Sequence, residues 1–145
     1  MTLVIAGCSR RKQTTNVPVP ALDLYEGGAV PRLRGRVAGH PARRARVWLL
    51  SAEHGLVHAD DRLLPYDRPL TLERADCLRV QVAGTVRRAM AATGSAQVLA
   101  ILEPLYLVCL ADLLAAPERP AIRWVPDPSR GWTEAAAVLD EWGWR

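Results

Sequence analysis

The sequence lacks the features that mark a membrane protein, a disulfide-rich secreted domain or a zinc-binding module. No apolar run approaches the roughly 18 to 20 residues that a membrane-spanning helix requires. Cys8, Cys77 and Cys109 show no C-x-x-C spacing, which supports neither a disulfide framework nor a zinc ribbon. Apolar residues precede the first basic ones, the reverse of a secretory signal. We therefore expect a cytoplasmic protein with reduced thiols and no membrane partner.

The familiar phosphate-binding motifs are absent as well. The sequence contains neither G-x-x-x-x-G-K-[ST] nor G-x-G-x-x-G, so it does not support a nucleoside triphosphatase or a dinucleotide enzyme. No internal repeat or low-complexity tract is found. What remains is a chain of 145 residues, 50% hydrophobic and 23% charged, which is the size and balance of a globular protein. We predict a single domain, residues 1–145.

Short apolar runs alternate with segments of helical periodicity. The predicted strands are 3–7, 47–52, 97–102 and 122–125. The predicted helices are a short one within 21–38, one capped by Thr71 that ends near Gly94, one over 105–115, and one capped by Thr133 that Gly143 ends. Segments 40–46 and 53–69 are predicted to be irregular. This alternation predicts an α/β fold, a mostly parallel sheet of about four strands between two layers of helices.

Ligands of such sheets bind beyond the carboxyl ends of the strands. Directly after the first predicted strand come Cys8, Ser9, Arg10, Arg11 and Lys12, whose amides, hydroxyl and cations could converge on a phosphate. The alternative is a solvated basic loop. Cys8 would be a nucleophile only beside a base, and a small residue that closes the strand is the simpler interpretation.

The segment that follows the second predicted strand, 51–67, is the richest in polar and aromatic residues. Ser51 can donate a hydrogen bond and Tyr66 can stack on a flat ring. Asp61 or Asp67 can stabilise a cationic transition state or activate water. The alternative is that both aspartates cap turns beside arginines and that Tyr66 only packs.

Two further patterns give no basis for a metal site or for an aromatic binding platform. His54 and His58 are four residues apart, but Gly55 argues against a helix that would bring them together, so no metal is predicted. Four tryptophans crowd the C-terminal region, where core closure or a contact within a homo-oligomer is the usual reason.

Positive charge is concentrated near the N-terminus. Up to Arg46 the chain has nine basic residues and only Asp23 and Glu26 as acids. This excess points to an anionic partner, either a phosphorylated small molecule or nucleic acid. An arginine-rich composition explains it equally well.

Four blocks of residues carry a resemblance to known families. In chain order they are Cys8-Ser9-x-x-Lys12, Pro20-Ala21-x-x-Leu24-Tyr25-x-Gly27, Leu50-Ser51-Ala52-x-x-Gly55-Leu56 and Pro65-Tyr66-Asp67. They resemble a small bacterial and archaeal domain family of unknown function and, more distantly, the YaaA peroxide-stress proteins. The first block is also similar to one in archaeosine synthases, which carry a module resembling uracil-DNA glycosylases. These resemblances imply a Rossmann-like fold associated with nucleobases, nucleotides or nucleic acid.

Two functions follow as hypotheses. The first is an enzyme, without a cofactor, that cleaves or transfers at the N-glycosidic bond of a nucleotide or nucleoside. Its expected ligand-binding residues are Ser9, Arg10, Lys12, Tyr25, Tyr66 and His54, with Tyr25 and Tyr66 on either side of the base. Its expected catalytic residues are Asp67, Asp61 and Ser51. The second is a DNA-binding stress protein without turnover that uses the basic N-terminal third.

Overall fold

A five-stranded sheet forms the centre of the protein, for which a computed structural model describes residues 2–145. Its strands are β1 (Thr2–Gly7), β3 (Val47–Ser51), β4 (Gly55–His58), β6 (Gln97–Ile101) and β7 (Ala121–Val125). They lie in the order β4-β3-β1-β6-β7, with β4 antiparallel to β3 and the other neighbours parallel. The four parallel strands are the four that the sequence predicts.

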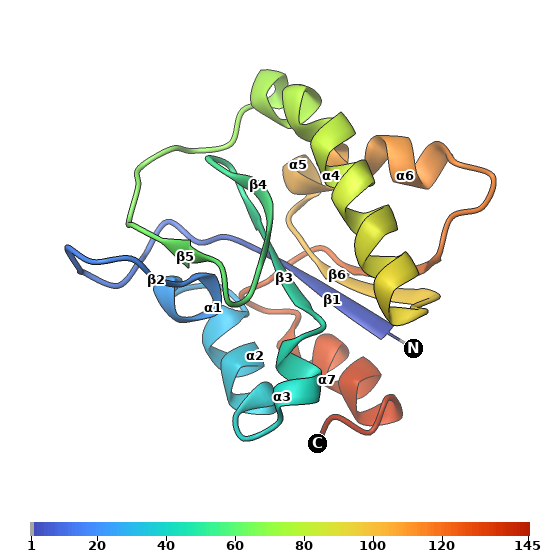
Figure 1. Ribbon diagram of the computed structural model, residues 1–145, viewed down its shortest axis with the longest axis horizontal. Helices are drawn as coiled ribbons and strands as arrows, with labels where there is room; N and C mark the ends of the chain where they lie inside the picture. The colour runs from blue at the N-terminus through green and yellow to red at the C-terminus, as the bar shows by residue number, and fades with distance from the viewer. Residues whose placement is uncertain (1) are drawn as a thin grey trace.

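Helices lie on both sides of this sheet (Figure 1). One side carries α4 (Leu72–Thr93), α5 (Pro104–Leu107) and α6 (Ala111–Ala115). The other carries α1 (Ala21–Leu24), α2 (Val30–Val37), α3 (Pro41–Arg44) and α7 (Trp132–Glu141). Alternate residues of β1 enter two separate hydrophobic clusters, Leu3 and Ile5 on the α4 side and Val4 and Ala6 on the other. Burial on both faces explains why β1 has a continuous apolar run, and a mixed α/β fold is confirmed.

Helix α4 forms as its sequence predicts. The Oγ1 of Thr71 accepts a hydrogen bond from the N–H of Arg74 at 3.1 Å, and Gly94 ends the helix with a left-handed φ of 67°. The buried residues Leu78, Val82 and Val86 form the apolar stripe that faces the sheet. No helix within residues 2–145 combines the length and the hydropathy needed to cross a membrane.

The structure corrects four local predictions. The 53–69 segment contains β4 and also β5 (Arg62–Leu63), which pairs with β2 (Val19–Pro20). The 40–46 connection contains α3. The helix predicted over 105–115 is divided into α5, a 3₁₀ turn η1 (Val108–Leu110) and α6.

The fourth correction concerns the start of α7. Its N-cap is Gly131 and not Thr133, and no side chain caps it. Glycine is required at this point because a Cβ atom would collide with Val125 Cγ1 and with the carbonyl oxygen of Asp127. Close packing against β7 therefore sets where the helix begins.

Candidate functional site

The carboxyl ends of β1 and β6 open onto a cavity of about 520 Å³. The chain passes from β1 to β3 on one side of the sheet and later places β6 on the other side of β1. The cavity thus lies at the point where the strand order reverses, the usual ligand position in open α/β sheets. Its walls come from segments 7–12, 27–28, 67–70, 103–106 and 128–129.

Charged side chains of both signs line this cavity. Arg10, Arg11 and Lys12 come from the loop after β1, Asp67 from the segment before α4, and Glu103 from the end of β6. Within residues 2–145, neither Arg10 nor Arg11 makes a side-chain hydrogen bond or ion pair, and neither do the carboxylates of Asp67 and Glu103. These groups are available to a ligand that carries both anionic and hydrogen-bond-donating groups.

The loop after β1 is held in place by its own hydrogen bonds. Ser9 Oγ donates to the carbonyl oxygen of Arg11 at 2.6 Å and accepts from the N–H of Gly27 at 3.1 Å. A backbone bridge joins Lys12 to Tyr25. The role of Ser9 in this structure is to shape the loop, which leaves anion binding to the neighbouring cations.

Lys12 is the only lysine in a chain with eighteen arginines. Its Nζ donates to the carbonyl oxygen of Arg10 at 3.2 Å and lies 4.4 Å from the centre of the Tyr66 ring and 5.9 Å from that of Tyr25. A compact ammonium fits over these two rings, whereas a planar guanidinium would present a different shape and donor pattern.

A buried row of hydroxyl groups holds these rings. Ser51 Oγ accepts from the N–H groups of Glu53 at 3.2 Å and His54 at 3.0 Å. It lies 2.7 Å from Tyr66 Oη, which lies 2.7 Å from Tyr25 Oη. Because the Ser51 oxygen already accepts two N–H groups, its own proton is left for Tyr66. Ser51, 0% exposed, therefore positions Tyr66 and does not face a cavity.

Burial raises the pKa of all three tyrosines of the chain. It raises that of Tyr25 to about 12 and that of Tyr66 further, with the nearby Cys8 adding to the shift in both. The pKa of Tyr106, whose Oη lies 2.9 Å from Cys8 Sγ, is raised for the same two reasons. The rings beside Lys12 are therefore neutral phenols, and they offer it their π faces instead of a negative charge.

These shifts predict an unusual titration. The native protein should show almost no phenolate absorbance at pH 10, about the pKa of a free tyrosine, whereas the urea-unfolded chain should titrate there with three phenols. Since the native state keeps protons that the unfolded state loses, stability is fully present below about pH 10 and falls as pH rises through 12. Tyr25 alone contributes on the order of 2–3 kcal/mol to this loss. A native phenolate signal already at pH 10 would contradict the buried arrangement.

The residues proposed from sequence separate into three groups. Ser9, Arg10, Lys12 and Asp67 meet at the cavity. His54 and Tyr66, whose rings meet edge to face at 5.3 Å, line a second hollow of about 380 Å³. Tyr25, Ser51 and Asp61 do not line either hollow. Tyr25 and Ser51 are fully buried, and Asp61 Oδ2 accepts the N–H of His58 within a turn.

Sequence reasoning missed several residues that line the cavity, and two of them, Glu103 and Tyr106, carry functional groups that matter for the site. Glu103 and Tyr106 follow β6, the direct neighbour of β1 in the sheet. The sequence does indicate this position, because Glu103 and Pro104 come immediately after the third predicted strand. The strand-end argument that selected Cys8 and Ser51 applies equally to Glu103.

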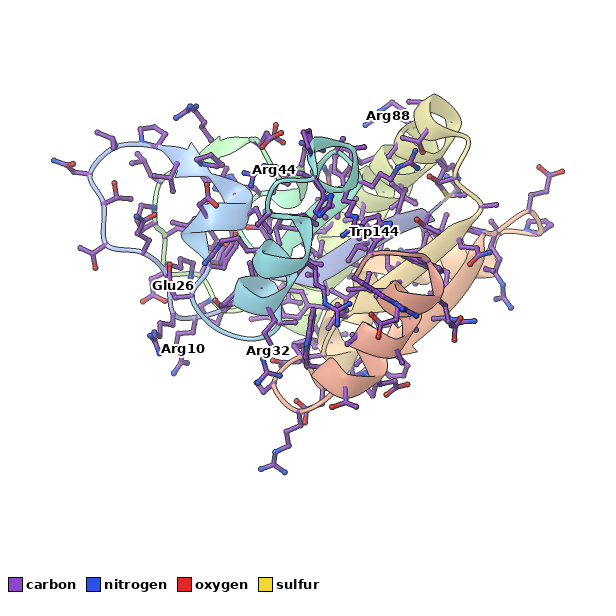
Figure 2. All side chains as sticks on the ribbon, turned by 90° about the horizontal axis from the view of Figure 1, so that it is seen from below. Arg10, Glu26, Arg32, Arg44, Arg88 and Trp144 are labelled. Carbon is purple, nitrogen blue, oxygen red and sulfur yellow. The ribbon has the colours of Figure 1, made fainter. Side chains whose placement is uncertain are left out.

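Most arginines of the basic N-terminal third are engaged within the protein. Arg34 donates to the carbonyl oxygens of Leu22 and Tyr25. Arg36 contacts Asp140 at 2.6 Å, and Arg44 contacts Asp60 at 2.6 Å. In Figure 2, Arg10 and Arg32 lie toward the lower edge of the molecule and Arg44 toward the upper edge. Part of the N-terminal positive charge is therefore held by partners within the protein, while Arg10, Arg11 and Lys12 line the cavity.

The amino-terminal four-fifths of the chain matches one family. The model of a family of unknown function (DUF6884) covers residues 3–115, from β1 to the end of α6. The comparisons with curated proteins and with solved structures gave no match. They do not support the resemblance to YaaA proteins or to the archaeosine synthase module, which stays a prediction.

Proposed function

The chain belongs to the DUF6884 family, and because that family has no known function, we propose from the site itself that it binds a nucleotide and cleaves its N-glycosidic bond. The observation that supports this proposal most is the cavity at the end of β1, which brings together cations and carboxylates that have no side-chain partner within residues 2–145. Its volume of about 520 Å³ suits a ligand of the size of a nucleoside monophosphate. We also propose that the fold is a Rossmann-like three-layer sandwich.

Phosphate recognition is assigned to the loop after β1. The side chains of Arg10 and Arg11 have no hydrogen-bonding or ionic partner in the described part of the chain and can form charge-assisted, bidentate hydrogen bonds to phosphate oxygens. Lys12 adds a point charge whose place is set by the ring of Tyr66. Ser9 keeps the loop in the shape that brings these cations to the cavity.

The chemical step is assigned to Asp67. Cleavage of the bond between the base and C1′ of the sugar leaves positive charge on the sugar, and a fixed carboxylate stabilises that charge. Water then supplies the oxygen at C1′ and a proton for the departing base, so that a nucleoside monophosphate gives free base and ribose 5-phosphate. Asp67 can also accept this proton from the water, provided that the proton is then passed on to the base. The proposed step is thus a hydrolysis and involves no cofactor.

Incubation of the pure protein with a panel of nucleoside monophosphates tests this directly. We expect release of free base from at least one of them, detected by chromatography, with a matching amount of ribose 5-phosphate. Nucleotide should also protect Lys12, the single lysine, from acylation, as read by peptide mass. If no nucleotide is cleaved and none protects Lys12, the proposal is wrong.

The alternative function is DNA binding without turnover. Because Arg34, Arg36 and Arg44 have partners within the protein, the basic surface available to DNA is smaller than the sequence suggests. A protein that neutralises several phosphates loses affinity steeply with salt. Tight, salt-sensitive binding to duplex or single-stranded DNA, without preference for any nucleotide, would favour this alternative over the pocket.

A further inference from the structure

Among residues 2–145, Tyr106 is the only aromatic residue that lines the cavity at the end of β1. The two tyrosines that the sequence suggests as neighbours of a base do not line it. Tyr25 is 0% exposed, and Tyr66 borders the second hollow. Any ring stacking inside this cavity therefore has to involve Tyr106.

The structure fixes the Tyr106 ring at one end. Its Oη lies 2.9 Å from the Sγ of Cys8, a contact between the end of β1 and helix α5 across 98 positions of the chain. Burial raises the pKa of Tyr106, so the phenol stays neutral at ordinary pH. A half-buried aromatic ring tied at its hydroxyl loses little freedom when a second ring packs on it.

The cavity has other apolar lining residues besides Tyr106. Leu70, Leu105 and Pro128 line it together with the Tyr106 ring. Leu105 and Pro128 follow β6 and β7, which lie on the same side of β1 in the sheet. Apolar lining residues of this kind accommodate a flat, uncharged ring, while the charged side chains of the same cavity suit a phosphorylated sugar.

We infer that Tyr106 is the residue on which the nucleobase stacks, and that the ligand of this cavity is recognised by its base as well as by its phosphate. This inference rests on the proposed function, since it assumes a nucleotide ligand. It replaces the sequence-based assignment of Tyr25 and Tyr66 to the base, and it makes Tyr106 a determinant of specificity that contributes to binding and not to bond cleavage.

Calorimetric titration with two ligands tests the inference. One is the nucleoside monophosphate that binds best, and the other is ribose 5-phosphate, which lacks the base. Working in an Asp67→Asn background keeps the nucleotide intact during the titration. We expect the nucleotide to bind at least tenfold more tightly than ribose 5-phosphate, because stacking of one base on an aromatic side chain has about this effect.

Variants at position 106 then separate the ring from the hydroxyl. Tyr106→Leu should remove most of the preference for the nucleotide and leave the affinity for ribose 5-phosphate within about twofold. Tyr106→Phe, the matched control, should keep the preference because it keeps the ring. If the leucine variant does not fold, Tyr106→Met provides a side chain of similar length without a ring.

Each other outcome is decisive. An equal loss of affinity for both ligands in Tyr106→Leu would mean that Tyr106 only shapes the cavity, and the inference would be wrong while nucleotide binding stood. Equal affinity of the wild-type pocket for both ligands would also refute the inference, since no base would be recognised. Failure of both ligands to bind at all would instead refute the proposed function, and the inference with it.

Discussion

Replacing Asp67 with asparagine should lower the rate of base release about 100-fold or more while nucleotide affinity changes little. The carboxylate of Asp67 lines the cavity without a hydrogen-bonding or ionic partner among residues 2–145, so no side chain there is paired with it directly. Its proposed work is to stabilise positive charge that develops on the sugar in the transition state. A group of that kind raises kcat and contributes little to the binding of the ground state. Single-turnover kinetics with a saturating nucleotide measures the effect.

Asp61 offers a matched control for this experiment. It lies six positions before Asp67, in the same polar segment, but its Oδ2 accepts the N–H of His58 at 2.9 Å inside a turn. Asparagine can accept the same hydrogen bond, so Asp61→Asn should fold and react like the wild type. Equal rates for Asp67→Asn and wild type would contradict our assignment, and Glu103, the other carboxylate that lines the cavity, would then be the group to replace.

Strands β1 and β6 were predictable because burial on both faces imposes a strong pattern. β1 and β6 lie in the interior of the sheet, so nearly every residue in them is apolar. β4 was not predictable in this way. It lies at the edge and consists of four residues, of which Val57 and His58 are partly exposed. A short edge strand needs no regular pattern, since its place comes from pairing with β3.

The position of the site was predictable from topology, but the direction of individual side chains was not. Ser51 ends β3 as expected, yet its hydroxyl turns into the protein toward Tyr66 and the following turn. Sequence spacing says which residue ends a strand and leaves open whether its side chain meets solvent or core. The same holds for Tyr25, which the packing of α1 and α2 buries completely.

Ser51→Ala should therefore destabilise the protein by about 2–4 kcal/mol, a fall of roughly 5–15 °C in Tm. The substitution leaves the N–H groups of Glu53 and His54, whose bonds to Ser51 are partly buried, and the hydroxyl of Tyr66 without their shared partner. Unmet hydrogen bonds of this kind cost about 1–3 kcal/mol each, partly relieved by rearrangement of the turn. Urea unfolding followed by tryptophan fluorescence measures the change.

A double-mutant cycle with Tyr66→Phe shows whether the hydroxyl row acts as a unit. Tyr66→Phe removes the bonds to Ser51 and Tyr25 but spares the two backbone bonds of Ser51, so its own cost should be smaller, about 1–2 kcal/mol. The double variant should be less destabilised than the sum of the single ones, because both lose the same bond between Ser51 and Tyr66. If Ser51 were instead a catalytic residue, Ser51→Ala would keep its Tm and lose only turnover. The expected loss of stability matters for the site as well, because the row that Ser51 anchors also fixes the Tyr66 ring under Lys12.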